Sequence, residues 1–154
     1  LGQLRPDAGE IDVKPAGGVQ IAWLGHADGL KPAETVRGAL TFWAGLHGAS
    51  PERVEPVMER MAVAHLAGRA CGTLSAGQRR RTALARLALS NAGLWILDEP
   101  TAPLDAVSRA RLGKLIADYR ATGGVVIATT HAALDWPDQT GLDLTDAARE
   151  ARSA

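Results

Sequence analysis

Several features that would assign this sequence to a class are scarce or absent. Cys71 is the single cysteine, so an internal disulfide is impossible and a disulfide-stapled secreted fold is excluded. No run of about 18 apolar residues occurs, so we expect no transmembrane helix. A basic and then apolar N-terminal segment is also lacking, so we expect no signal peptide. The 17 basic residues balance the 17 acidic ones, which argues against the broad positive surface of a nucleic-acid-binding protein.

The composition that remains is that of a globular protein. Hydrophobic residues make up 46% and charged residues 22% of 154 residues, which suits one domain, or part of one, with a sizeable core. The unpaired thiol favours a reducing compartment. Because the first residue is Leu1 and not methionine, we expect the chain to be a piece of something longer.

Short apolar runs alternate with helical patterns along the chain. We predict strands over residues 11–13, 19–24, 94–97 and 125–129, and helices over 34–47, 50–66, 75–91 and 106–119, with a further short helix over 144–151. The runs at 94–97 and 125–129 are continuously apolar, as in strands covered on both faces. Strand, helix and strand in this order predict an α/β fold with a parallel sheet.

The predicted second helix opens with Ser50 and Pro51, and we expect the Ser50 hydroxyl to cap it. Met58 and Met61 lie on its apolar face, and we interpret them as core or contact residues rather than cofactor ligands. In the third helix, the charges of Arg79–Arg81 are interpreted as a solvated face.

Two adjacent carboxylates, Asp98 and Glu99, follow the apolar run at 94–97. Open α/β sheets bind ligands at the carboxyl ends of their strands, and an unpaired buried charge is costly. A divalent cation would compensate Asp98, while Glu99, one residue further on, would polarise an attacking water. The alternative is that both carboxylates merely begin a surface turn before Pro100.

A second motif, Leu74–Gln78 (LSAGQ), opens the third predicted helix. Ser75 and Gln78 fit a capping box, in which each side chain accepts a hydrogen bond from the other residue's amide. The small residues Ser75 and Gly77 leave the helix N-terminus open, and such a terminus binds phosphate readily. The alternative is a plain helix start.

Two further candidate site residues are His131 and Asp105. His131 lies just after the predicted strand over 125–129, where its imidazole would contact a γ-phosphate or hold the water-activating carboxylate; a structural histidine is the alternative. Asp105 precedes the predicted helix over 106–119. It is either an N-cap or a residue that reports across a subunit interface.

In this order and spacing, the motifs resemble the nucleotide-binding domain of ABC ATPases. The resemblance covers nearly the whole chain up to His131 and implies an α/β, P-loop NTPase-like parallel sheet core with an α-helical subdomain. It implies ATP and Mg²⁺ as cofactors and a head-to-tail dimer with a second ATPase subunit. The implied roles are the signature motif for Ser75, Ala76, Gly77 and Gln78, the Walker B aspartate for Asp98, the catalytic glutamate for Glu99, the D-loop residue for Asp105 and the switch histidine for His131.

A narrower resemblance rests on Leu24–His26, Gly29–Lys31, Phe42–Trp43 and Leu46–Gly48. These segments look like the ATPase subunit of the cytochrome c maturation, or haem-exporter, family. That family commonly has His at the position of His26, where most ABC domains have Gln near the Mg²⁺ water and the membrane partner.

This narrower resemblance implies haem export for c-type cytochrome biogenesis, at the cytoplasmic face of the bacterial inner membrane. It implies an integral membrane permease as partner, with haem-handling maturation proteins also possible and no nucleic acid. Candidate permease contacts lie in the segment from Glu34 to about Leu66, although core packing explains them equally well; they are Trp43, Val57, Met58 and Met61.

The sequence also departs from the family. No G-x-x-x-x-G-K-[ST] loop occurs, so the chain resembles an ABC domain without its N-terminal strands and Walker A loop. We expect residues 1–24 to be a remnant of the N-terminal core strands, 25–74 the Q-loop region and helical subdomain, and 75–154 the signature helix, Walker B, D-loop and H-loop core with a C-terminal tail. Alone, such a piece is expected to bind ATP weakly and to aggregate through exposed apolar surface.

Three other functions remain alternatives. The chain fits the ATPase subunit of a different ABC exporter, or a truncated interaction module that does not hydrolyse ATP because Walker A is missing. A soluble ABC ATPase acting in DNA repair or translation ranks last. The segment between His26 and Ser75 is too short for a long coiled coil, and the balanced charge disfavours nucleic acid.

Overall fold

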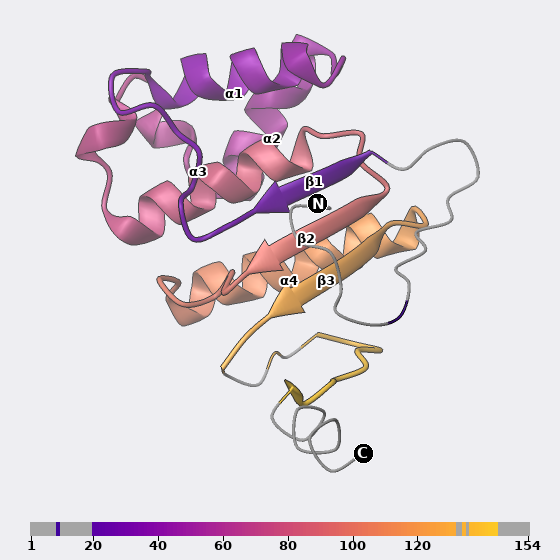
Figure 1. The fold of residues 1–154 in the computed structure, drawn as a ribbon. Helices are drawn as coiled ribbons and strands as arrows, with labels where there is room; N and C mark the ends of the chain where they lie inside the picture. The colour runs from indigo at the N-terminus through magenta and orange to yellow at the C-terminus, as the bar shows by residue number, and fades with distance from the viewer. Residues whose placement is uncertain (1–8, 10–19, 132–133, 135, 145–154) are drawn as a thin grey trace.

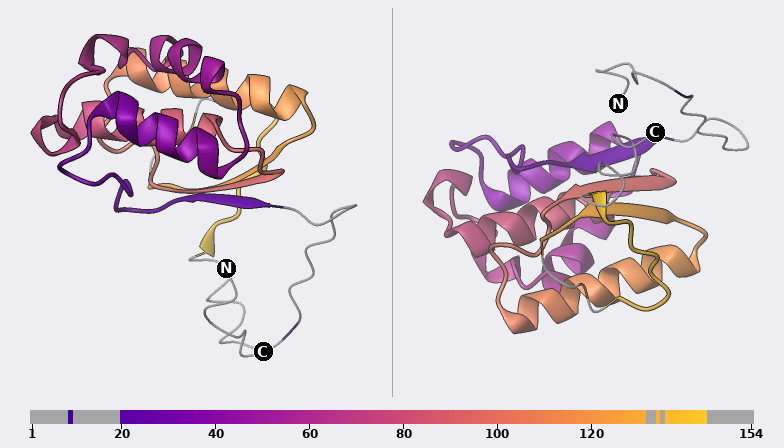
Figure 2. Two further views of the ribbon diagram at one scale, coloured as in Figure 1. Left: turned by 90° about the horizontal axis from the view of Figure 1, so that it is seen from above. Right: turned by 60° about the horizontal axis from the view of Figure 1, so that its bottom comes forward.

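The computed structural model describes residues 9, 20–131, 134 and 136–144. In this part of the chain a three-stranded parallel sheet carries its helices on one face (Figure 1 and Figure 2, left). The strands are β1 (Ile21–Leu24), β2 (Leu94–Asp98) and β3 (Val125–Thr129), in the order β1-β2-β3. The parallel α/β sheet expected from the sequence is confirmed.

The register of the sheet brings the ends of the three strands to one edge. Leu24 of β1 lies opposite Leu97 of β2, and Asp98 lies opposite Thr129 of β3. All three arrowheads in Figure 1 point the same way, so the loops that follow the strands leave from the same side. Ligands of open parallel sheets bind at this edge.

Four α-helices and three short 3₁₀ turns complete the described fold (Figure 1). Between β1 and β2 the chain forms α1 (Val36–Leu46), η1 (Pro51–Arg53), α2 (Val54–Arg60), η2 (Ala64–Leu66), η3 (Cys71–Thr73) and α3 (Ala76–Ala88). Helix α4 (Ala106–Ala121) connects β2 to β3, and Gly123, with a φ of 89°, ends it in the left-handed region that glycine adopts at little cost. Among these helices, none is long and apolar enough to cross a bilayer.

The start of the second helix differs from the prediction. Pro51 occupies the first helical position as expected, but the Ser50 hydroxyl makes no capping hydrogen bond. The first turn is 3₁₀, so the Arg53 amide donates to the Ser50 carbonyl at 3.0 Å. That amide is the one a capping hydroxyl would have accepted from. The predicted hydroxyl cap is therefore wrong.

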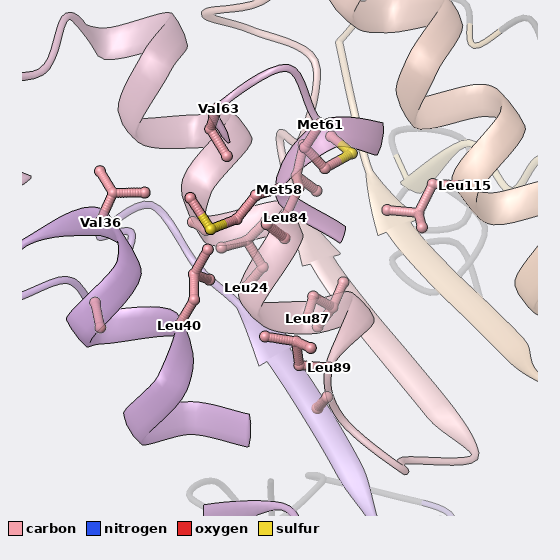
Figure 3. Close-up of a cluster of buried hydrophobic side chains, with 14 of the residues drawn as sticks. Leu24, Val36, Leu40, Met58, Met61, Val63, Leu84, Leu87, Leu89 and Leu115 are labelled. Atoms are coloured by element: carbon pink, nitrogen blue, oxygen red, sulfur yellow. The ribbon is translucent and has the colours of Figure 1, made fainter. Parts of the chain in front are cut away.

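The core lies between the helices and the sheet face that they cover (Figure 3). Met58 and Met61 have no exposed surface, which confirms them as core residues and removes them as permease contacts. Cys71 is also buried, and burial, followed by the charge of Glu34, raises the pKa of its thiol. Other large hydrophobic side chains with no exposed surface are Leu24, Val36, Leu40, Val63, Leu84, Leu89, Leu97 and Leu112.

The opposite face of the sheet is apolar and largely open. In β3, Val125 and Ile127 are 55% and 54% exposed, and Trp23 of β1 is 56% exposed. The prediction of coverage on both faces therefore holds for Leu94 in the central strand, which is 8% exposed, and is wrong for β3. The physical reason is that α1, α2, α3 and α4 all lie on one side of the sheet (Figure 2). The strand expected over 11–13 and most of the helix expected over 144–151 lie outside the described residues.

The open face predicts how the 154-residue chain behaves in solution. Exchanging Val125 and Ile127 for threonine keeps two β-branched residues in the strand while removing exposed apolar surface. We expect V125T/I127T to form less aggregate than the unaltered chain, measured by light scattering and size-exclusion chromatography. The matched control is L142T/L144T, which changes two leucines that are 78% and 68% exposed outside the sheet. Equal aggregation of all three proteins would contradict the role of this face.

Candidate functional site

The edge where the three strands end collects four of the residues that the sequence singled out, which are His26, Asp98, Glu99 and His131. The loop after β1 contains His26, the turn after β2 begins with Glu99, and His131 lies two residues beyond β3. Because β2 is central, the turn that follows it lies between the loops that follow β1 and β3 (Figure 1).

Asp98 is held by the strand next to it. The Thr129 hydroxyl donates to Asp98 Oδ1 at 2.7 Å, and the Glu99 amide donates to both the carbonyl and the hydroxyl oxygen of Thr129, at 3.2 and 3.3 Å. The pairing of Asp98 with Thr129 in the sheet makes these contacts possible. Thr129 was missed as a site residue. The signal for it is a hydroxyl at the end of the strand beside the acidic one.

Glu99 and His131, the two predicted catalytic residues, come together. His131 Nε2 lies 3.4 Å from Glu99 Oε1, with the imidazole 96% exposed and the carboxylate side chain 28% exposed. Glu99 has a φ of 43°, a left-handed conformation that costs a non-glycine residue about 1–3 kcal/mol. Such strain concentrates at functional sites because the surroundings must enforce it.

Arg80, on α3, supplies part of that enforcement. Its side chain is 4% exposed, and its guanidinium donates to the carbonyl oxygens of both Asp98 and Glu99, the latter at 2.9 Å. The predicted solvated face is therefore wrong for Arg80. The signal was its helical phase, since Arg80 precedes Leu84 and Leu87 of the buried stripe by four and seven residues.

The flanking arginines differ from Arg80. Arg79 is exposed, as the solvated face predicts, and its guanidinium donates to the Leu74 carbonyl at 3.1 Å. Arg81 is partly buried and donates to the Ser108 hydroxyl at 3.0 Å, so it holds α3 against α4. Three successive arginines on one helix thus have three different environments.

The predicted capping box at the start of α3 is confirmed. The Gln78 amide donates to Ser75 Oγ at 3.3 Å, and the Ser75 amide donates to Gln78 Oε1 at 3.0 Å. A Cβ at Gly77 would lie 3.0 Å from the Pro103 carbonyl oxygen, so this turn packs against the loop before α4. Ala76 between them is exposed.

Asp105 caps α4. The Ser108 amide donates to its Oδ1 at 2.8 Å, and hydrogen bonds from the Ser108 hydroxyl and amide lower the pKa of the carboxyl. The N-cap interpretation is confirmed, while a role across a subunit interface stays a prediction. His26 is exposed, and Arg80 links its loop to the backbone carbonyls of Asp98 and Glu99. The Ser75–Gln78 turn packs against Pro103 rather than against the carboxylates.

A cation at this edge would have few ligands from the protein. Within the described residues, no group of three His, Cys, Asp or Glu side chains is arranged to hold a metal ion. Asp98 keeps acceptor capacity beside its bond from Thr129, because a carboxylate can accept about four hydrogen bonds. One carboxylate fits Mg²⁺, which keeps waters and takes substrate phosphates as its other ligands.

Comparisons with known proteins identify the family to which the chain belongs. The family model described as ABC transporter matches residues 1–102. A cytochrome c biogenesis ATP-binding export protein CcmA from Maricaulis maris is 47% identical over 148 residues, covering 93% of this chain and 69% of that protein. The protein of the same name from Cereibacter sphaeroides is 44% identical over 89% of this chain and 63% of its own length. The chain thus spans about two thirds of the curated relatives that it matches.

Solved structures show the same fold. An inward-facing ABC transporter of the putative metal-chelate type superposes with a TM-score of 0.65 at 27% identity, over 84% of this chain and 54% of that one. An ATP-binding cassette in a dimeric post-hydrolysis state, bound to ADP and phosphate, gives 0.66 at 22% identity over 74% of this chain and 53% of that one. The expected ABC ATPase fold is confirmed. On the family match and the relatives together, the chain belongs to the ABC transporter family, among the cytochrome c biogenesis ATP-binding export proteins.

Proposed function

We propose that this chain is the ATP-hydrolysing part of a membrane transporter that exports haem for the biogenesis of c-type cytochromes. The observation that carries the proposal is the convergence of Asp98, Glu99 and His131 at one sheet edge. The names of the relatives, which are ATP-binding export proteins of cytochrome c biogenesis, support the choice of transporter.

In the proposed mechanism the residues at this edge have separate tasks. Asp98, oriented by the Thr129 hydroxyl, holds Mg²⁺, which when bound neutralises charge on the ATP phosphates. The Glu99 carboxylate accepts a hydrogen bond from the attacking water and orients it toward the γ-phosphate. His131 lies within reach of that carboxylate and keeps it in position.

The second part of the site is supplied by another copy of the subunit. The first turn of α3 presents amide groups and the positive end of the helix dipole, which suit an anion. Since the side chains of Ser75 and Gln78 cap each other, the backbone of Ala76 and Gly77 is the proposed contact to the ATP held by the partner. Asp105 is proposed to approach the same interface.

A surface on α1 is the proposed permease contact. Phe42 and Leu46, one helical turn apart, are 53% and 62% exposed, and the Phe42 and Trp43 rings meet edge to face at 5.8 Å. The Arg86 guanidinium lies 4.6 Å from the centroid of the Trp43 ring, which adds a positive charge beside the apolar surface. We propose, as the sequence suggested, that 25–74 form the Q-loop region and helical subdomain and that 75–131 carry the signature helix, Walker B, D-loop and H-loop core. The subunit is proposed to lie at the cytoplasmic face of the inner membrane.

Glu99→Gln tests the water-activating group. The amide cannot act as a general base, so phosphate release by the full-length subunit is expected to fall by about 10²-fold or more, while ATP binding is retained. Turnover is measured by phosphate release and binding by equilibrium titration. Glu59→Gln, at an exposed carboxylate on α2, is the control and should keep normal turnover. Wild-type turnover in Glu99→Gln would contradict the assignment.

Ser75→Arg tests the contact across the dimer. An arginine at the start of α3 would fill the anion site, so ATP-dependent dimerisation of a Glu99→Gln subunit is expected to be lost. Ser75→Ala removes only the cap, at about 1 kcal/mol of stability, and should still dimerise. Size-exclusion chromatography with and without ATP distinguishes the two variants. Dimerisation of Ser75→Arg at normal ATP concentrations would rule out this contact.

Phe42→Ser with Leu46→Ser tests the α1 surface. Loss of the exposed apolar contacts is expected to reduce co-purification with the permease while basal ATP hydrolysis stays normal. Val107→Ser is the matched control, because Val107 is 65% exposed on α4. If both proteins co-purify with the permease equally well, the docking surface lies elsewhere.

A further inference from the structure

One buried side chain joins two loops of the proposed site. Besides the Asp98 and Glu99 carbonyls, the Arg80 guanidinium donates to the Gly25 carbonyl at 2.8 Å and to Asp28 Oδ1 at 3.0 Å. Gly25 and Asp28 flank His26 in the loop after β1. The contacts are divided between the two terminal nitrogens, with Nη1 on the β1 loop and Nη2 on the β2 turn.

The contacts on the β2 turn determine the backbone of Glu99. The Asp98 carbonyl belongs to the peptide before Glu99, and the Glu99 carbonyl belongs to the peptide after it. Successive carbonyls of an extended strand point to opposite sides, whereas the positive φ of Glu99 lets both meet one guanidinium. Fixing both peptide planes fixes φ and ψ, and therefore the direction in which the Glu99 side chain leaves the backbone.

The loop after β1 is also held in position by neighbouring side chains. A Cβ at Gly25 would lie 2.4 Å from the Trp23 ring, so the chain passes close to that side chain. Arg86 also holds this stretch by donating to the Trp23 carbonyl at 3.1 Å. Asp28, with its side chain 15% exposed, supplies the carboxylate that pairs with the buried charge of Arg80. A displacement of the loop that carries His26 therefore moves an acceptor of Arg80.

We propose that Arg80 is a positioning residue that holds Glu99 in its water-activating orientation and couples that orientation to the loop carrying His26. This inference rests on the proposed ATP hydrolysis. Lysine can replace arginine only in part, because one ammonium has no planar fork with which to contact both loops at once. A purely structural role for Arg80 would affect stability and leave the chemistry of the folded enzyme unchanged.

The test uses the full-length subunit with ATP and Mg²⁺. Arg80→Gln is expected to lower kcat at least tenfold with KM changed less than threefold, and Arg80→Lys to recover part of the loss. Hydrogen exchange should accelerate in both 25–31 and 99–104 in Arg80→Gln. Asp28→Asn should accelerate exchange mainly in 25–31. The control is Arg60→Gln, which removes an arginine that bridges α2 to Asp118 and the Lys114 carbonyl of α4 and should keep a normal kcat.

The outcomes separate this inference from the proposed function. If the wild-type subunit releases no phosphate, the proposed function fails. If it does, and folded Arg80→Gln or Arg80→Lys keeps wild-type kcat, the positioning role is overturned. Should Arg80→Gln not fold, Arg80→Lys and Asp28→Asn decide by the same measurements. In a Glu99→Gln background, Arg80→Gln is expected to lower the residual kcat by less than twofold, and a further tenfold fall would show that Arg80 acts other than through Glu99.

Discussion

The pairing of β2 with a parallel strand on each side is the constraint on which the site depends. It sets Asp98 beside Thr129 and places the loops after β1 and β3 next to the turn that begins at Glu99. Without this register the Thr129 hydroxyl could not orient Asp98, and Arg80 could not reach two loops at once. The geometry of the candidate site therefore depends on the register of the sheet more than on any single motif.

Polar residues at the helix N-termini also define where the helices begin. Thr35, Ser75 and Asp105 each accept a hydrogen bond from an amide in the first turn of a helix. Ser75 caps α3 in the same segment that is proposed to contact nucleotide. Capping and the proposed binding use different atoms of that segment. The side chains complete the cap, and the backbone amides beside them are the groups offered to the anion.

Much of the fold and most of the site residues could be predicted, because apolar runs mark strands and their ends mark sites. The predicted strand at 94–97, the capping box at Ser75 and Gln78 and the meeting of Glu99 with His131 all depend on patterns along the chain. Arg80 and Thr129 were missed because their roles depend on neighbours that only the folded chain provides. The buried position of Arg80 follows from its place on the helix, which a run of three arginines does not reveal. The partner of the Thr129 hydroxyl follows from strand pairing, which the linear sequence does not show.

The two remaining differences between prediction and structure, at Ser50 and in β3, also depend on information that the linear pattern does not contain. The Ser50 hydroxyl does not cap the helix because the first turn is 3₁₀ and the Arg53 amide donates to the Ser50 carbonyl instead. Composition does not specify which of these hydrogen bonds forms. In β3, Val125 and Ile127 are exposed although the strand is continuously apolar. Such a run indicates that both faces of a strand are suited to burial, but it does not indicate which element packs against each face.

Cys71 has a practical consequence for work on this 154-residue chain. Its thiol is 2% exposed, and its raised pKa leaves little of the reactive thiolate at neutral pH. A cysteine introduced at an exposed position would therefore react with maleimide labels well before the native one does. Fluorescent or spin probes could be attached to a single chosen position without first removing the natural residue.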